Sequence, residues 1–187
     1  MGKRLTITGG WLENARRVLS PNADERPCGE QVSLIVVHGI SLPPGKYGGG
    51  WIDALFTNTL DEQAHPYFQS LGELRVSAHV MIDRSGAINQ YVSFDRRAWH
   101  AGVSCFQERE CCNDFSVGIE LEGCDDEPYE MAQYEALAAV ASALLALYPD
   151  ISRQAIVGHC DIAPGRKTDP GVAFDWDKFN YLLDVHG

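Results

Sequence analysis

The stretch VSLIVVH, from Val32 to His38, decides the fold of this chain. It is a nearly continuous run of apolar, mostly β-branched residues, which is typical of a central strand buried on both faces of a sheet. The run ends abruptly in His38-Gly39, and the Gly/Pro-rich segment SLPPGKYGGG follows, with the composition of a surface loop. A histidine is therefore expected at the end of the most buried strand.

Further elements follow on both sides of this strand. A hairpin is predicted from Val76 to Val92, with its turn at residues 83–86, where Gly86 supplies the positive φ that such a turn needs. Two more strands are predicted, at 115–123 and 155–157. Four helices are predicted as well, at 11–18, 51–56, about 130–148 and 174–183. Strands interspersed with helices indicate a single α/β (α+β) domain over residues 1–187 with a mixed central sheet flanked by helices.

Composition and charge exclude several classes of protein. The 15 basic and 26 acidic residues give a net charge of −11, which argues against a nucleic-acid partner. No window approaches the roughly 18 apolar residues of a membrane span, and no secretory signal is visible. A cytoplasmic location is therefore expected, and the six cysteines, which lack a CxxC pair, are expected to be free thiols.

The stretch GHCDIAPGRKTDPG, from Gly158 to Gly171, concentrates reactive side chains between Gly and Pro residues. It follows a short apolar run, and such a strand-to-loop junction is where α/β proteins often keep their chemistry. If the strands that end at His38 and before His159 are neighbours, both imidazoles emerge at one sheet edge, and Asp169 can fold back to them. A His/His/Asp set suits zinc. By spacing alone Cys160 and Asp161 are rival ligands, and a strand-end histidine can also be purely structural.

Glu120 is the second residue that points to chemistry. It lies in the otherwise apolar strand FSVGIELEG, where an unpaired buried carboxylate is costly, and a carboxylate beside a metal-bound water can act as a general base. The alternation equally allows Glu120 and Glu122 to face solvent. Lys167 is either a solvated surface lysine or a cation that stabilises a developing oxyanion.

The chain resembles the type-2 N-acetylmuramoyl-L-alanine amidases from about residue 20 to 180. The matching segments, in order, are SLIVVHGISLPPG, DALFTNTLD with HPYF, LRVSAH, DRRAWHAGVS, CNDFSVGIELEG, GHCDIAPGRKTDPG and FDW. The resemblance implies the mixed sheet shared with peptidoglycan recognition proteins. It implies one zinc ion held by His38, His159 and Asp169, with Glu120 as acid/base residue and Lys167 as transition-state stabiliser. One departure is Gly39, where similar family members carry Asn, which leaves the local geometry there in question.

The resemblance also implies a substrate and a role. The expected substrate is a small cytoplasmic muropeptide, cut between the lactyl group of (1,6-anhydro)-N-acetylmuramic acid and L-alanine during cell-wall recycling, which would also lower the signal that induces chromosomal β-lactamase. No nucleic acid, membrane or obligate protein partner is expected. Arg75 and Trp99 are candidate substrate contacts, although Trp99 can equally be a core residue. Two rival functions are a non-catalytic peptidoglycan-binding module and an exported cell-wall amidase.

Overall fold

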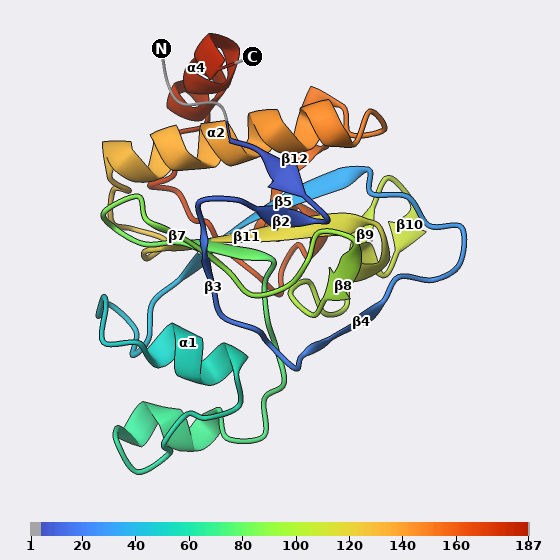
Figure 1. Ribbon diagram of the computed structural model, residues 1–187. Coiled ribbons are helices and arrows are strands. Elements are labelled where there is room, and N and C mark those ends of the chain that lie inside the picture. Colours follow the sequence, from blue (N-terminus) through green and yellow to red (C-terminus); the bar gives the residue numbers. More distant parts are fainter. Residues whose placement is uncertain (1–4, 187) are drawn as a thin grey trace.

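The computed structural model describes residues 5–186, and a six-stranded mixed sheet forms its centre (Figure 1). The strand order is β12-β5-β11-β6-β7-β3. Their bounds are β3 Arg16–Arg17, β5 Leu34–Ile40, β6 Val80–Ile82, β7 Ile88–Gln90, β11 Ser116–Glu122 and β12 Ile156–Gly158. The two seven-residue strands, β5 and β11, run parallel at the middle of the sheet, and their register places Glu120 beside His38.

The edge of the sheet where β5 and β12 end brings the two predicted histidines together. β12 is the parallel neighbour of β5 on the side away from β11, and His159 follows its last residue. The condition for a shared site, that the two strands leading to these histidines are neighbours, is therefore met. The predicted hairpin is also present, because β6 and β7 pair antiparallel across a turn in which Gly86 has φ 84°.

Helices cover both faces of the sheet. The helix α2 (Met131–Leu147) lies across one face with α4 (Trp176–His186) outside it, whereas α1 (Trp51–Phe56) and the 3-10 helix η1 (Pro66–Ser70) lie beyond the other face (Figure 1). Each face has an apolar core, and all seven residues of β11 are buried. The helices predicted at 51–56, 130–148 and 174–183 are thus present, and the single mixed α/β domain is confirmed.

The helix predicted at 11–18 is wrong. This segment instead forms two short strands, β2 (Trp11–Leu12) and β3. The backbone N–H of Leu12 donates to the side chain of Gln90 (2.8 Å), and β3 pairs with β7 at the edge of the sheet. These long-range hydrogen bonds outweigh a weak local helix preference.

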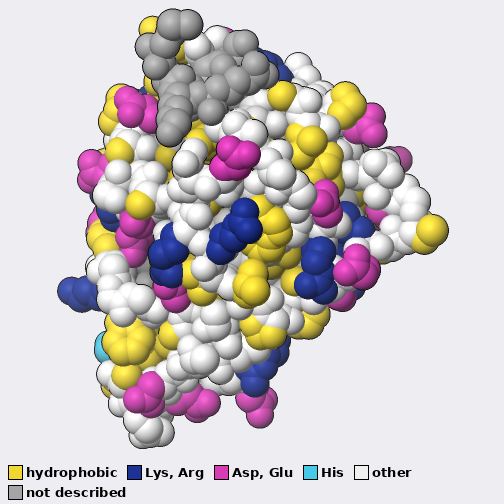
Figure 2. Space-filling view, viewed as in Figure 1, with side chains coloured by type: hydrophobic (Ala, Val, Ile, Leu, Met, Phe, Trp, Pro, Cys, Tyr) yellow, Lys and Arg dark blue, Asp and Glu magenta, His cyan; other side chains and the backbone are white. Residues whose placement is uncertain are grey.

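Short elements complete the structure. They are β1 Ile7–Thr8, β4 Ala23–Glu25, β8 Arg96–Ala98, β9 Cys105–Phe106, β10 Arg109–Glu110, η2 Cys112–Asp114, η3 Arg153–Ala155 and α3 His159–Ile162. The last of these is a helical turn inside the segment that was predicted to be irregular. Within residues 5–186, no helix has the length and apolar character needed to cross a membrane. Basic and acidic side chains are interspersed over the face shown in Figure 2.

Candidate metal centre and active-site cleft

Three predicted side chains converge at the edge of the sheet where β5 and β12 end. His38 Nδ1 lies 2.9 Å from His159 Nδ1 and 3.2 Å from Asp169 Oδ2, and His159 Nδ1 lies 3.0 Å from the same carboxylate oxygen. Both imidazoles are almost fully buried, whereas the carboxylate retains some exposure to the cleft. This is the one group of three or more His, Cys, Asp or Glu side chains in residues 5–186 whose ligand atoms lie close enough together to hold a metal ion.

The hydrogen bonds around His159 test whether this group fits a cation. Its Nε2 lies 3.1 Å from the carbonyl oxygen of Ala101, which can only accept, so Nε2 carries the ring proton. The Nδ1 atom that faces Asp169 therefore has a free lone pair, and two acceptors meet at 3.0 Å. Burial also lowers the pKa of His38 to about 4, against the opposing effect of Asp169, so this ring is neutral near pH 7. Neutral imidazoles and a carboxylate are the donor set that Zn²⁺ accepts.

The loop from Gly158 to Gly171 folds back through its own backbone. The N–H of Cys160 donates to the carbonyl of Asp169 (3.0 Å), which brings the carboxylate beside His159. The rival ligand Asp161 is used elsewhere, because its carboxylate accepts from the N–H of Gly158 (2.7 Å). Neither Cys160 nor Asp161 belongs to the convergent group.

Glu120 faces this centre from the neighbouring strand. Its side chain is only 9% exposed, and Oε2 has no hydrogen-bond partner among the described residues. Burial, reinforced by the nearby charge of Asp169, raises the pKa of Glu120 well above its usual value, and Lys167 only partly offsets this. A raised pKa makes this carboxylate a stronger base than an exposed glutamate, which suits a group that takes up and returns a proton.

Glu122 is buried too, but in a different role. Its two carboxylate oxygens accept from the backbone N–H groups of Gly48 (2.5 Å) and Arg84 (3.3 Å). The alternative in which Glu120 and Glu122 face solvent is thus wrong, because the α1 side of the sheet is covered. Glu122 therefore connects the loop after β5 to β11 through its hydrogen bond from Gly48.

A cleft of about 460 Å³ opens over these groups. Lys167 and Glu120 both line it, together with the three convergent side chains. The opposite wall is largely apolar and comes from the loop after β5, from α1 and from the η1 region: Leu42, Pro44, Leu55, Phe56, Tyr67, Leu71, Leu74 and Val76. This wall was not predicted from the sequence. The residues that lead up to Leu71 have no periodic hydrophobic pattern, and only the HPYF segment of the family resemblance drew attention to this part of the chain.

The structure brings neither predicted substrate contact into the lining of the cleft. The guanidinium of Arg75 is exposed and donates to the carbonyls of Gly72 and Leu74, although its neighbours Leu74 and Val76 are lining residues. Trp99 is partly buried and lies near Asp24, whose pKa is lowered chiefly by Arg97 and also by this indole. The substrate-binding roles of Arg75 and Trp99 stay predictions.

The structure shows what occupies the space beside Gly39, the position at which similar family members carry Asn. A Cβ atom built at this position would lie 2.3 Å from the hydroxyl of Tyr129, which donates to the carbonyl of Pro170 (2.9 Å). Tyr129 is buried, and burial raises the pKa of its phenol. The tyrosine therefore occupies the space that a side chain after His38 would need, and it holds the backbone next to Asp169.

Comparison with known proteins agrees with this geometry. The family model of N-acetylmuramoyl-L-alanine amidase (Amidase_2) matches residues 29–172. The chain is 63% identical over 179 residues to the 1,6-anhydro-N-acetylmuramyl-L-alanine amidase AmpD of Escherichia coli, with 96% of this chain and 97% of the relative covered. It is 62% identical to the protein of the same name from Citrobacter freundii, over 96% of this chain and 95% of that one.

Solved structures show the same fold. A crystal structure of a selenomethionine AmpD derivative superposes with a TM-score of 0.93 at 61% identity, and covers 95% of this chain and 99% of that chain. AmpDh3 from Pseudomonas aeruginosa, solved in complex with an anhydromuramic pentapeptide, has a TM-score of 0.61 at 31% identity, and the match covers 83% of this chain and 61% of that one. The resemblance predicted from the sequence is confirmed, and the chain belongs to the N-acetylmuramoyl-L-alanine amidase family.

Proposed function

We propose that this chain is a zinc-dependent amidase of cell-wall recycling. Its substrate is a muropeptide, and the bond cut joins the lactyl group of N-acetylmuramic acid, in its 1,6-anhydro form, to L-alanine. The observation that carries the proposal is the pairing of three convergent acceptor atoms with a buried, unpartnered carboxyl group in one cleft. The names of the relatives from Escherichia coli and Citrobacter freundii support the same bond and the anhydro sugar.

His38, His159 and Asp169 would hold one zinc ion per chain. When bound, zinc supplies a Lewis acid that polarises a carbonyl group and lowers the pKa of water. The ligand set leaves room for such chemistry, because three protein ligands are the usual number at a catalytic zinc site. The whole of residues 1–187 then acts as a single amidase domain.

Glu120 moves the proton in this mechanism. The raised pKa lets its carboxylate take a proton from the water that attacks the lactyl carbonyl and then deliver it to the nitrogen of the departing L-alanine. Lys167, which also lines the cleft, stabilises the negative charge that develops on the carbonyl oxygen. The apolar wall opposite excludes water from one side of the bound substrate.

The experiment combines metal analysis with a defined substrate. The purified chain should contain one zinc per molecule and release the tripeptide from an anhydromuramyl tripeptide, as followed by mass spectrometry. Chelation should abolish release, and added zinc should restore it. A protein that binds zinc and muropeptide without cutting the amide would instead be the binding-module rival.

Location and cellular role belong to the same proposal. We infer a cytoplasmic enzyme whose substrate is soluble, and whose activity lowers the muropeptide signal that induces β-lactamase. Parallel digestion of soluble muropeptide and intact sacculi separates this role from that of a wall-degrading enzyme. A preference for sacculi would overturn the recycling role and leave the chemistry intact.

A further inference from the structure

The dipeptide His100-Ala101 contacts both histidines of the metal centre, one through a side chain and one through the backbone. His100 Nδ1 lies 2.9 Å from His38 Nε2, and the carbonyl oxygen of Ala101 lies 3.1 Å from His159 Nε2. In each case the contact is to the ring nitrogen that faces away from the convergent group. The dipeptide therefore meets the two rings at the positions that decide which nitrogen carries the proton.

The hydrogen bonds of His100 decide which of its ring nitrogens carries the proton, and through it which nitrogen of His38 does. We call the hydrogen-bonded series Ser116, His100 and His38 the relay. The Ser116 hydroxyl donates to the carbonyl of Cys112 (2.5 Å), so it has only lone pairs to offer to His100 Nε2, 3.1 Å away. His100 then carries its proton on Nε2 and accepts on Nδ1. The acceptor at Nδ1 requires the proton of His38 to lie on Nε2. The lone pair of His38 is consequently left on Nδ1, the atom that faces His159 and Asp169.

A glycine in the sheet makes room for His100. A Cβ atom at Gly118 would lie 2.4 Å from Cγ of His100 and 2.6 Å from its Nδ1, far inside van der Waals contact. The ring thus packs directly on the backbone of β11, two residues before Glu120. A side chain at this position would push the imidazole away from His38.

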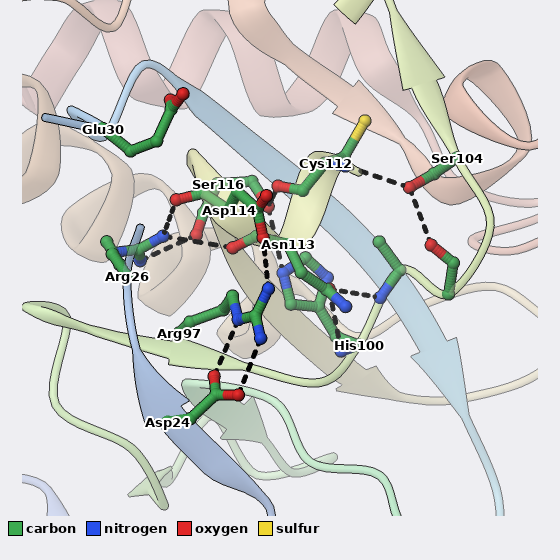
Figure 3. Close-up of polar contacts among 12 residues, drawn as sticks. Asp24, Arg26, Glu30, Arg97, His100, Ser104, Cys112, Asn113, Asp114 and Ser116 are labelled. Atoms are coloured by element: carbon green, nitrogen blue, oxygen red, sulfur yellow. Dashed lines mark hydrogen bonds and ion pairs between the residues drawn. The ribbon is translucent and has the colours of Figure 1, made fainter. Parts of the chain in front are cut away.

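Two side chains fix the backbone of the dipeptide: Asn113 binds its N–H groups, and the guanidinium of Arg166 donates to the carbonyl of Ala101 (2.6 Å). Asn113 Oδ1 accepts from the N–H groups of both His100 (3.1 Å) and Ala101 (2.8 Å). Asn113 belongs to η2, and the guanidinium of Arg26 donates to the carbonyls of Asn113 and Asp114 in η2 and of Ser116 at the start of β11. Figure 3 shows His100, Asn113 and Ser116 gathered in this network, with Arg26 beside them. The dipeptide is therefore held from two directions.

We propose that His100-Ala101 sets the tautomers of His38 and His159, and that His100 is a positioning residue for metal binding. Without these two acceptors, each buried ring could place its proton on Nδ1 and lose the lone pair that a metal ion needs. The proposal rests on the proposed function only for the presence of a metal ion. It adds that metal affinity depends on a histidine that lies outside the convergent group of His38, His159 and Asp169.

The test compares two isosteric replacements of His100. His100→Asn places Oδ1 at the position of Nδ1, so the acceptor for His38 remains, whereas His100→Leu places a methyl group there. Zinc affinity is measured by competition with a chromophoric chelator. His100→Leu should bind zinc about 10- to 100-fold more weakly than the parent, the usual cost of removing such a partner. His100→Asn should recover most of that loss.

A buried histidine outside the relay serves as control for general destabilisation. His79 is fully buried: its Nδ1 accepts from the N–H of Gly118, its Nε2–H donates to the carbonyl of Arg96, and it bonds to neither ligand. Its ring packs against that of His100 (centroids 5.8 Å apart) without a hydrogen bond to it, so it controls for packing at the same place. His79→Leu should lower the thermal stability of the metal-free protein without a comparable loss of zinc affinity. Equal affinity losses for His79→Leu and His100→Leu would assign the effect to folding and overturn the proposal.

Nitrogen-15 chemical shifts of the imidazoles give a readout independent of affinity. In the zinc-loaded parent, His38, His100 and His159 should each show a protonated Nε2. In metal-free His100→Leu, the ring of His38 should shift toward the Nδ1–H tautomer, and His100→Asn should reverse this. Full zinc affinity in His100→Leu, or an Nδ1 proton on His100 in the parent, would overturn the proposal. A parent that binds no zinc would instead refute the proposed function.

Discussion

Replacement of Glu120 by Gln tests the chemistry most directly. The change keeps the shape of a side chain that is 9% exposed and removes its ability to take a proton. The imidazoles of His38, His100 and His159 in the cleft lining already use both ring nitrogens, so none of these three can take its place. Proton transfer by a positioned side chain contributes about 10²- to 10⁴-fold, or about 2.7–5.4 kcal/mol of barrier. We expect a loss in the upper half of that range.

The assay is single-turnover release of peptide from an anhydromuramyl tripeptide, with zinc content measured on the same samples. Glu122→Gln is the matched control, because this side chain is also buried on the same strand but accepts from the backbone of Gly48 and Arg84. It should affect turnover far less than Glu120→Gln. Turnover close to that of the parent in zinc-loaded Glu120→Gln would refute the assignment.

The same variant has a predicted effect on stability. Burial raises the pKa of Glu120 in the folded state, so above pH 4.5 the folded metal-free protein holds a proton that the unfolded chain releases. The free energy of unfolding therefore decreases as pH rises toward the pKa of the folded state, and each unit of pKa difference is worth about 1.4 kcal/mol. Glu120→Gln removes this penalty. Metal-free Glu120→Gln should be more stable than the parent to urea at pH 7, and a less stable variant would contradict the burial argument.

Three further outcomes follow from the site. Gly118→Ala should weaken zinc binding, measured by chelator competition, because its Cβ would lie 2.4 Å from the ring of His100; unchanged affinity would show that the ring can shift freely. Gly39→Asn should lower the melting temperature, because the hydroxyl of Tyr129 occupies the required space, and the Tyr129→Phe background should relieve only part of that loss. Urea unfolding of metal-free Glu120→Gln, which lacks the opposite contribution of Glu120, should show stability falling as pH decreases from about 6.5 to 5, since the unfolded chain gains protons on rings whose pKa values burial has lowered. These rings are His38 (pKa about 4), His79 (pKa about 3) and His100 (pKa well below its usual value).

The strands that carry the site could be predicted because most of their residues are apolar, which indicates burial. The run before His38 is apolar enough to require a central strand, and the alternation around Glu120 identifies a second one. The parallel register that sets Glu120 beside His38 was not predictable, since β6 and β12 could pair with these strands in several orders. Alternation also could not show that the polar face of β11 is covered, because the covering segment, α1 and η1, lies some 50 residues earlier in the chain.

Local polarity was an incomplete guide at two other places. The polar segment QERECCND is exposed from Gln107 to Cys111, but Cys112 is fully buried, because the backbone of η2 accepts from Ser116 and Arg26. The segment from Trp11 to Val18 reads as a helix, but its backbone is used by β7 and by the side chain of Gln90. In both cases the decisive hydrogen bonds come from residues far away in sequence, which local propensity does not register.

The loop from Gly158 to Gly171 shows how the two kinds of information combine. Its glycines and prolines predict that the chain turns back after His159, and its composition supplies an aspartate at the return. The position of that aspartate is set by backbone contacts: Cys160 N–H to the Asp169 carbonyl, and the Tyr129 hydroxyl to Pro170. These contacts come from α3 and from the segment before α2, so the candidate ligand in the loop is placed by the rest of the domain. We therefore expect substitutions at Tyr129 to shift Asp169, and with it the candidate metal site, through the backbone of Pro170.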